Sequence, residues 1–508
     1  MHPRNARWVA VASAILALVT LVALPRFGAT VVRAAIENES AADRAAFAAG
    51  DSPWSWRFRE RDDVVAGRAF GSGVLTVVED GLAFRATDGS AMEIGLPLAR
   101  PVDVRRLDRL RLSAEASAPG SYAWVARETL TGPLRRATLG AFPGGPLPPV
   151  LRLDHLDWTD PAGRPAAPPA RAAMLRLEVT LPAAATFTLH EASLVPADGP
   201  IRPPVGALPS RLSAEGLLAW RDHARAADPL VTFGPGTAAW PPGTASGPTH
   251  ARLSWLPPFA YVLVLGAFVA SALLRQRRPS VVATGSPVAV PPVVNTPAPA
   301  IHTDNGFRPP APVRDLIDVV LVLIGPLWFI AGLGLSDRPD PPGVTMFVAG
   351  AAYAFFLDAT GMLPRWLWLG TWRAAGWPLL AVPAALCVVV FFGHAPAWPP
   401  LGRVAVYVGW ALFQQWLMLA VVGALLARAL PRPLAVLLTA LAFALLHTPN
   451  GLLMQLCFVA EFGWAWWYFH RRALLPVALA HALSAVLLQA GLAGGLLRSL
   501  EVSARFLG

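Results

Sequence analysis

The chain has 508 residues, of which 55% are hydrophobic and 15% charged, and its mean hydropathy is +0.48. These values exclude an ordinary soluble protein, and the length exceeds one compact core, so we expect a membrane protein of several domains. The net charge of +10 is expected to orient the chain against the cytoplasmic leaflet, so it does not indicate a nucleic-acid partner. Cys387 and Cys457 lie in apolar runs, which excludes a secreted disulfide framework and predicts two small buried side chains.

A basic leader at the start of the chain is followed by an apolar run from Trp8 to Leu24. The run is longer than a usual signal-peptide core and just long enough to span, so residues 1–29 are predicted to be an uncleaved anchor rather than a cleaved signal. Under either alternative the basic leader stays in the cytoplasm and the next residues cross the membrane. We therefore predict a multi-pass inner (plasma) membrane protein with residues 30–250 on the extracytoplasmic side.

Residues 30–250 have the mixed charge of a water-soluble domain and many short runs of alternating apolar residues. This pattern predicts an N-terminal extracytoplasmic all-β sandwich, jelly-roll-like and loosely similar in layout to galactose-binding-like domains. Its tryptophans are expected in the core, although exposed ones could stack on the sugars of a cell-surface glycan. Strands are expected at 73–78, 107–114, 123–128, 174–180, 186–190 and 192–195, and a short helix at 211–226. The tryptophans assigned to this core are Trp54, Trp56, Trp124 and Trp158.

A second apolar span is predicted at residues 251–275, and the basic residues that follow it place its end in the cytoplasm. Residues 276–313 are rich in proline and lack apolar periodicity, which predicts an extended or disordered cytoplasmic linker. In residues 314–508 the apolar runs follow one another closely, so we expect an all-α polytopic membrane bundle. Its spans are predicted near 316–336, 342–360, 375–393, 402–428, 433–447, 451–469 and 474–497.

Two histidines, His447 and His481, lie inside long apolar segments of this bundle. An ionisable side chain at such a position implies a polar cavity or a partner. A third predicted helix carries the adjacent pair Gln414 and Gln415, so three helices could direct polar groups to one cavity. Between residues 401 and 500 the only carboxylate is Glu461, on the helix between the two histidines.

This arrangement resembles the CPBP family, the bacterial Abi and CAAX-protease-like intramembrane proteases, over about residues 375–497. The segments FALLHTPN and LLPVALAHALSAVLL carry the resemblance. The family pattern is a Glu-Glu pair followed by an arginine, then Phe-x-x-x-His, then His-x-x-x-Asn. One glutamate and the first histidine activate a water, and the second histidine and the asparagine stabilise the oxyanion. The resemblance implies that His447 activates water and that His481 lies on the oxyanion side.

The chain departs from the family pattern at four positions. Gln414 and Gln415 stand in place of the glutamates, Leu419 in place of the arginine and Ala485 in place of the asparagine. A glutamine amide can position a water but cannot take its proton, so the family's general base is absent. Loss of the arginine is consistent with this, because a buried cation without its anion is costly. Loss of an oxyanion donor costs about a hundredfold in other enzymes.

Glu461 could replace the missing base if its carboxylate faced the cavity. Alternatively it is a structural partner of a histidine or of a tryptophan indole. By residue type, Glu461 and the two histidines would also form a two-histidine, one-carboxylate metal set. Their spacing matches no short metal motif, so neither a metal nor another cofactor is predicted. For the two glutamines the alternative role is hydrogen bonding between helices.

Taken together, these residues predict a divergent intramembrane endopeptidase-like protein, active or impaired, in contact with membrane lipid. Its substrate would be a peptide or protein at the membrane. The alternative is a catalytically silent scaffold or receptor, a pseudoenzyme whose β-sandwich binds a cell-surface glycan. The candidate catalytic residues are His447, His481, Gln414, Gln415 and Glu461.

Overall fold

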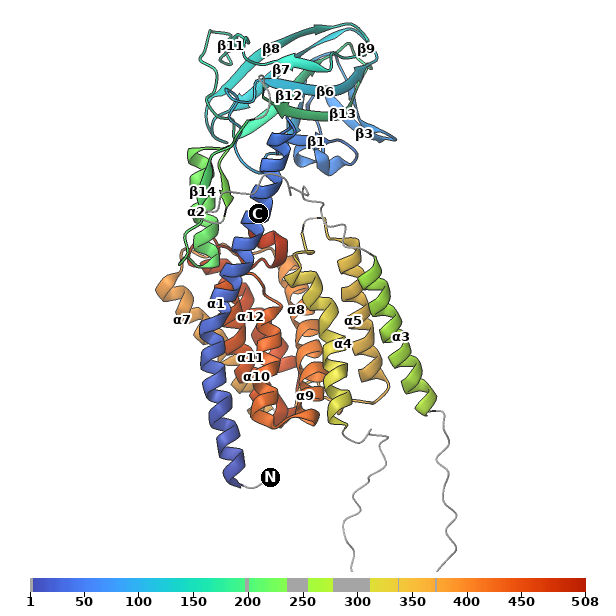
Figure 1. Cartoon of the computed structure of the whole chain (residues 1–508), viewed down its shortest axis with the longest axis vertical. Coiled ribbons are helices and arrows are strands. Elements are labelled where there is room, and N and C mark those ends of the chain that lie inside the picture. The colour runs from blue at the N-terminus through green and yellow to red at the C-terminus, as the bar shows by residue number, and fades with distance from the viewer. Residues whose placement is uncertain (1–2, 197–200, 235–254, 277–310, 337, 371) are drawn as a thin grey trace, which may run out of the picture. The chain divides into compact units, whose positions relative to one another are not determined.

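The computed structural model describes residues 3–196, 201–234, 255–276, 311–336, 338–370 and 372–508. These residues form two compact units (Figure 1). The helical unit contains the first helix as far as Val32 and the helices from Leu256 onward, and the β unit contains the strands. The predicted linker at 276–313 lies almost entirely outside the described residues.

The β unit consists of two antiparallel sheets that are not closed into a barrel, which confirms the predicted all-β fold. The first sheet has the order β10-β6-β13-β4-β3, with β1 on β13 and β9 on β6; the second has the order β11-β8-β7-β12-β5-β2. A short parallel pair, β14 and β15, is separate. The strands are β1 Ser55–Arg57, β2 Phe70–Gly71, β3 Gly73–Val78, β4 Gly81–Ala86, β5 Met92–Leu96, β6 Arg109–Ala116, β7 Gly120–Arg127, β8 Leu134–Phe142, β9 Gly145–Pro146, β10 Val150–Arg152, β11 Trp158–Thr159, β12 Met174–Thr180, β13 Thr186–Val195, β14 Val205–Ala207 and β15 Thr232–Gly234.

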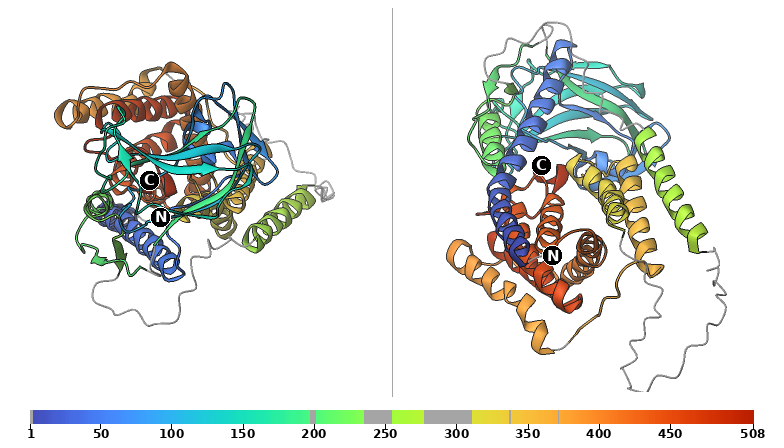
Figure 2. Two further views of the ribbon diagram at one scale, coloured as in Figure 1. Left: turned by 90° about the horizontal axis from the view of Figure 1, so that it is seen from above. Right: turned by 60° about the horizontal axis from the view of Figure 1, so that its bottom comes forward.

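Alternation along the strands explains why these residues pair into sheets. In β12, Leu175, Leu177 and Val179 are buried while the residues between them are half-buried. They join Phe84 and Phe187 of the other sheet in one apolar core, so each sheet covers the apolar face of its neighbour. The two runs predicted at 186–190 and 192–195 form the single strand β13, with a bulge between Leu189 and Glu191. Figure 2 shows both sheets from two further sides.

The four tryptophans named from the sequence belong to the interior of the β unit, as predicted. Trp54, Trp124 and Trp158 are buried. Trp56 is half-buried and packs against the same core, and its indole Nε1 donates a hydrogen bond of 2.8 Å to the carbonyl of Pro97. The three buried rings therefore offer no open face for stacking on a sugar.

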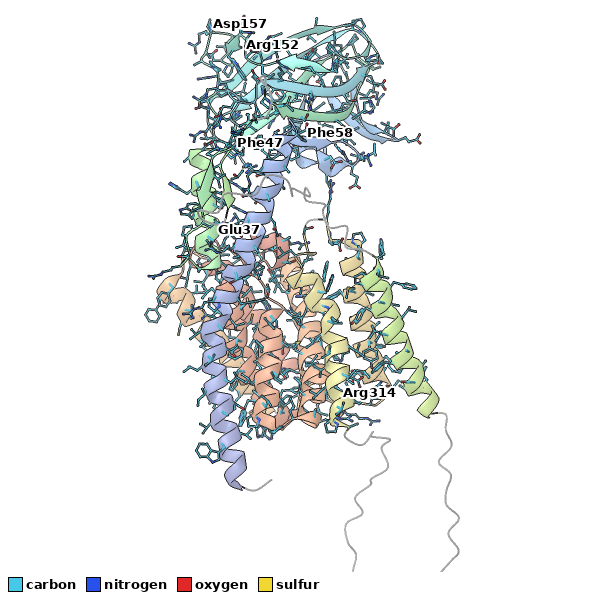
Figure 3. The ribbon with its side chains drawn as sticks, in the orientation of Figure 1. Glu37, Phe47, Phe58, Arg152, Asp157 and Arg314 are labelled. Atoms are coloured by element: carbon cyan, nitrogen blue, oxygen red, sulfur yellow. The ribbon has the colours of Figure 1, made fainter. Side chains whose placement is uncertain are left out.

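Helix α1 (Pro3–Ala48) is continuous through residue 29, where the anchor was predicted to end. The residues that follow are rich in alanine and contain neither proline nor glycine before Gly50, so the helix has no reason to stop there. Its last turns belong to the β unit, where Phe47 is fully buried in the apolar core (Figure 3). Asp43 forms a buried ion pair of 2.5 Å with Arg100.

Helix α2 (Ala214–Ala227) falls where a short helix was predicted.

The helical unit is built from apolar helices, which confirms the predicted all-α membrane region. Five of the described helices are long and apolar enough to cross a membrane, and they indicate a multi-pass membrane protein. These are Trp8–Ala48, Leu256–Leu273, Pro341–Ala359, Leu401–Ala429 and Leu475–Leu492. In full, its elements after α1 are α3 Leu256–Gln276, α4 Pro312–Ala331, α5 Pro341–Ala359, α6 Trp372–Leu379, α7 Ala381–Phe392, α8 Leu401–Gln415, the π-helical segment η3 Trp416–Gly423, α9 Ala424–Ala429, α10 Arg432–Leu445, α11 Gly451–Arg471, α12 Leu475–Leu492 and the 3-10 helix η4 Ser503–Leu507.

The other predicted spans fall on helices that are shorter or more polar. The span near 433–447 corresponds to the short helix α10, and the one near 375–393 to α6 and α7 together. Helix α7 packs mainly on α12 and is otherwise exposed. Cys387 on α7 is therefore exposed, which corrects the prediction of a buried side chain; Cys457 on α11 is half-buried.

Helix α4 carries three charged residues near its first turn, and each is paired. Arg314, labelled in Figure 3, contacts Asp318 at 3.0 Å, and Asp318 also accepts a hydrogen bond of 2.8 Å from the Tyr353 hydroxyl. Asp315 contacts Arg428 at 3.2 Å. The contacts of Tyr353 with Asp318 and of Arg428 with Asp315 join α4 to α5 and α9. Because both carboxylates are almost fully buried, loss of either partner should be destabilising.

The membrane portion of α1 packs on the hairpin formed by α10 and α11. Leu24 lies in an apolar cluster with Met454 and Phe458, and Gln455 donates a hydrogen bond of 2.8 Å to the carbonyl of Leu21. At Gly28 an added Cβ would lie 2.6 Å from the carbonyl oxygen of Pro449, so only glycine permits this close approach. Helix α1 thereby supports the loop that follows His447.

Candidate active site

A cavity of about 480 Å³ opens among α8, α10, α11 and α12 of the helical unit. Its walls are mainly apolar, and the polar side chains that reach it come from different helices. Gln414 comes from α8, His447 from the end of α10, and His481 and Ser484 from α12. Aromatic residues complete the wall: Phe329, Phe347, Tyr407, Trp410, Phe443 and Trp464.

His447 lies just beyond the last turn of α10 and is 8% exposed. Its ring Nδ1 lies 2.8 Å from the carbonyl oxygen of Phe443, one turn earlier in the chain. A carbonyl oxygen can only accept, so Nδ1 carries the hydrogen and Nε2 keeps its lone pair. His447 can therefore accept a proton from a group in the cavity.

His481 lies in the middle of α12, and its ring is held between two aromatic side chains. The rings of Phe443 and His481 meet edge to face, with their centroids 5.4 Å apart. The ring of Trp464 also contacts that of His481, at a centroid distance of 5.6 Å. Phe443 also meets the ring of His447 at 4.8 Å. One buried phenylalanine thus contacts both imidazoles, so the two histidines predicted from separate segments face one cavity.

The two glutamines diverge, because successive residues of a helix point about 100° apart. Gln414 lines the cavity. Gln415 is fully buried, and its amide nitrogen Nε2 lies 3.0 Å from the carboxylate of Glu461 and 3.3 Å from Nδ1 of His481. Only one member of the pair therefore reaches the cavity directly.

Glu461 is also fully buried and does not line the cavity. One of its oxygens accepts from Gln415, and the other has no partner among the described residues. Gln415 thus separates the carboxylate from the histidine that it could otherwise contact. Among the described residues no group of three or more His, Cys, Asp or Glu side chains is placed to hold a metal ion.

The orientation of the Gln415 amide determines which nitrogen of His481 carries the hydrogen. Nε2 of Gln415 bears two hydrogens, so one can be donated to Glu461 and the other to Nδ1 of His481. The reverse orientation would leave two buried N–H groups unpaired, instead of the one carbonyl oxygen that now lacks a partner. With Nδ1 accepting, His481 carries its hydrogen on Nε2 and is a donor.

The two histidines and the two glutamines of this site lie within a region that resembles a known family. Residues 396–487 match the family described as type II CAAX prenyl endopeptidase Rce1-like. The chain contains an Rce1-like CAAX protease domain. The match runs from just before α8 into α12 and includes both glutamines, Glu461 and both histidines. No curated protein matches the chain.

Leu419 and Ala485, which were compared above with the arginine and the asparagine of the family pattern, are both apolar. Leu419 lies in η3 and is fully buried in the main apolar core, where an unpaired cation would be destabilising. Ala485 lines the cavity and offers no donor. The π-helical segment that contains Leu419 begins directly after Gln415, and such segments are frequent at functional sites.

Sequence reasoning missed two features of this site. Ser484 lines the cavity, and its position three residues after His481, on the same helix face, could have identified it. Residues 500–502 and Arg505 also line the cavity, and no pattern predicted this. Asn450 holds this tail, because its side chain caps α11 at Leu453 and donates to the carbonyls of Ser499 and Glu501.

Proposed function

We propose that the protein is an intramembrane endopeptidase in which His447 is the general base and His481 is a hydrogen-bond donor. The observation that carries the proposal is that both imidazoles line one cavity, with Nδ1 of His447 on a backbone carbonyl oxygen and Nδ1 of His481 on the amide nitrogen of Gln415. One ring accepts while the other donates, as hydrolysis of a peptide carbonyl requires.

In the proposed reaction a water molecule lies between Nε2 of His447 and the carbonyl carbon of the substrate. His447 takes a proton from the water while the water oxygen bonds to that carbon. The electron pair of the C=O bond moves to the carbonyl oxygen of the substrate. Nε2–H of His481 donates a hydrogen bond to the oxyanion. When the C–N bond breaks, His447 returns the proton to the leaving amine, so the enzyme ends unchanged.

The two glutamines and Glu461 have supporting roles in this proposal. Gln414 lines the cavity and orients the water or the substrate through hydrogen bonds. Gln415 holds His481 in its donor form. Glu461 holds Gln415 by accepting its other hydrogen, and because it does not reach the cavity it acts through Gln415 rather than as the base.

The proposed substrate is a peptide at the membrane whose apolar part enters the cavity. The family name points to CAAX tails, in which a prenylated cysteine precedes the residues to be removed. The apolar walls suit such a lipid-bearing segment. We further propose that the protein resides in the plasma membrane with residues 30–250 outside the cytoplasm, as the basic leader favours.

Reconstitution in liposomes with internally quenched membrane peptides, including a farnesylated CAAX peptide, tests the proposal. We expect cleavage by the wild type and a loss of at least a hundredfold in His447→Ala. The matched control is His470→Ala, because His470 also contacts the carbonyl four residues earlier, at 2.7 Å, but is exposed and does not line the cavity. Absence of cleavage by the wild type across the peptide set would support the silent scaffold instead.

A further inference from the structure

Ser484 is a polar group of the cavity to which the mechanism above assigns no role. It lies one turn after His481 on α12 and is 8% exposed. Its hydroxyl oxygen is buried and has no hydrogen-bond partner among the described residues. A buried hydroxyl without a partner is destabilising, so its retention needs a reason.

Other hydroxyls on the membrane helices show what Ser484 does not do. Thr439 donates to the carbonyl of Ala435 at 2.8 Å, and Ser271 donates to that of Phe268 at 2.8 Å. Such bonds to the preceding turn are the usual way to satisfy a serine or threonine in an apolar helix. Ser484 makes no such bond and instead lines the cavity, so its donor is available to a molecule that enters.

We propose that the Ser484 hydroxyl donates a hydrogen bond to the carbonyl oxygen of the bound peptide, beside the donor nitrogen of His481. This inference rests on the proposed function and adds a substrate-contacting residue to it. The two side chains are three residues apart on one helix, so they share a face and can approach the same oxygen. As water adds to the carbonyl carbon, both donors stabilise the negative charge that develops on that oxygen.

A nucleophilic role for Ser484 is not supported by the same contacts. A serine nucleophile needs a neighbouring base to take its proton. Nδ1 of His481 already accepts from Gln415, and its Nε2 carries a hydrogen, so this ring has no lone pair left for the serine. His447 keeps a free lone pair, but it makes no hydrogen bond with the Ser484 hydroxyl among the described residues. In the proposal the hydroxyl therefore keeps its proton throughout, and no bond to Ser484 forms or breaks.

The experiment measures both binding and cleavage of the farnesylated CAAX peptide by the full chain in nanodiscs. We expect Ser484→Ala to lower kcat about 10- to 100-fold and to weaken binding by no more than about fivefold, because the lost contact matters most in the transition state. Ser484→Thr keeps the hydroxyl and should restore most of kcat. Ser271→Ala is the matched control, since its hydroxyl bonds within its own helix, and should behave as the wild type.

The outcomes separate the inference from the function on which it rests. Cleavage with an unchanged kcat in Ser484→Ala overturns the inference and leaves the proposed function standing. A wild type that binds the peptide without cleaving it overturns the proposed function; Ser484→Ala should then still weaken binding about fivefold, and equal binding would overturn the inference. A wild type that neither binds nor cleaves overturns both.

Discussion

The amide of Gln415 donates a hydrogen bond of 3.0 Å to the carboxylate of Glu461, and the same nitrogen lies 3.3 Å from His481. Gln415 is thus the link between the Glu461 carboxylate and a histidine of the cavity. The chemistry proposed for the site depends on this link, and it can be tested by changing each residue in turn.

Replacing Glu461 distinguishes a positioning residue from a base. In Glu461→Gln the new side chain can still accept from Gln415 through its carbonyl oxygen, so we expect cleavage within a few fold of wild type. In Glu461→Leu the acceptor is lost and Gln415 can turn, so kcat should fall about tenfold, equivalent to roughly 1.4 kcal/mol. The measurement is kcat for the farnesylated peptide, together with ¹⁵N NMR of the His481 ring. Complete inactivity of Glu461→Gln would instead identify Glu461 as the base.

Introducing a glutamate should have opposite effects at the two glutamine positions. Gln414→Glu places a carboxylate in the cavity, where it can take a proton from water, so we expect kcat to rise at least tenfold. Gln415→Glu places a carboxylate against Glu461, and like charges in a buried site are unfavourable. That variant should gain no activity and should have a lower melting temperature in detergent. Equal activation by both changes would contradict the divergent orientations of Gln414 and Gln415.

Breaking the ion pair between Asp315 and Arg428 should destabilise the helical unit. Asp315→Ala leaves the Arg428 guanidinium buried without this carboxylate, a change that typically costs about 3–5 kcal/mol. Thermal unfolding in detergent should show a clear decrease in the melting temperature. The control is Glu191→Gln, which removes an exposed pair with Arg57 and should leave the melting temperature within error.

His394, in the loop between α7 and α8, should make the stability of that loop depend on pH. Its ring nitrogens each lie 2.9 Å from a carbonyl oxygen, of Ala395 and of Ala493, and these contacts raise its pKa above the ordinary value. The stabilisation is therefore complete below the pKa of the unfolded state, roughly 6.5, and is lost as pH rises through the higher folded-state pKa. Limited proteolysis of the loop should be slower at pH 5.5 than at pH 8.5, and His394→Asn should remove the difference.

Alternation and apolar length predicted much of the fold. The strands β3 and β12 lie where the sequence placed them, and the short helix near the end of the β unit does too. These patterns report local burial, which the backbone period converts directly into secondary structure. The continuation of α1 to Ala48 and the union of two runs into β13 were not predicted, because a helix boundary and a bulge depend on neighbouring elements.

The candidate site shows a similar division. The spacing of Phe443 and His447 on one helix, together with His481 on another, was enough to predict a shared cavity, since residues four apart share a face. The separation of Gln414 from Gln415 follows from the same helical period, but which of the two faces the cavity depends on how α8 is rotated against α12. The same is true of Ser484, whose lack of a partner is visible only after every neighbour has been placed.

The sequence alone determined that this is a membrane protein with a β-rich domain, and that two histidines and a glutamine pair share its last helices. Composition and period suffice for this, because hydrophobic burial acts on each segment in turn. The tertiary structure alone decided that Glu461 lies behind Gln415 and outside the cavity, and that Nδ1 of His447 faces a backbone carbonyl while Nδ1 of His481 faces an amide nitrogen. Hydrogen bonds are short and directional, so their partners are set by the packing of whole helices and not by spacing along the chain.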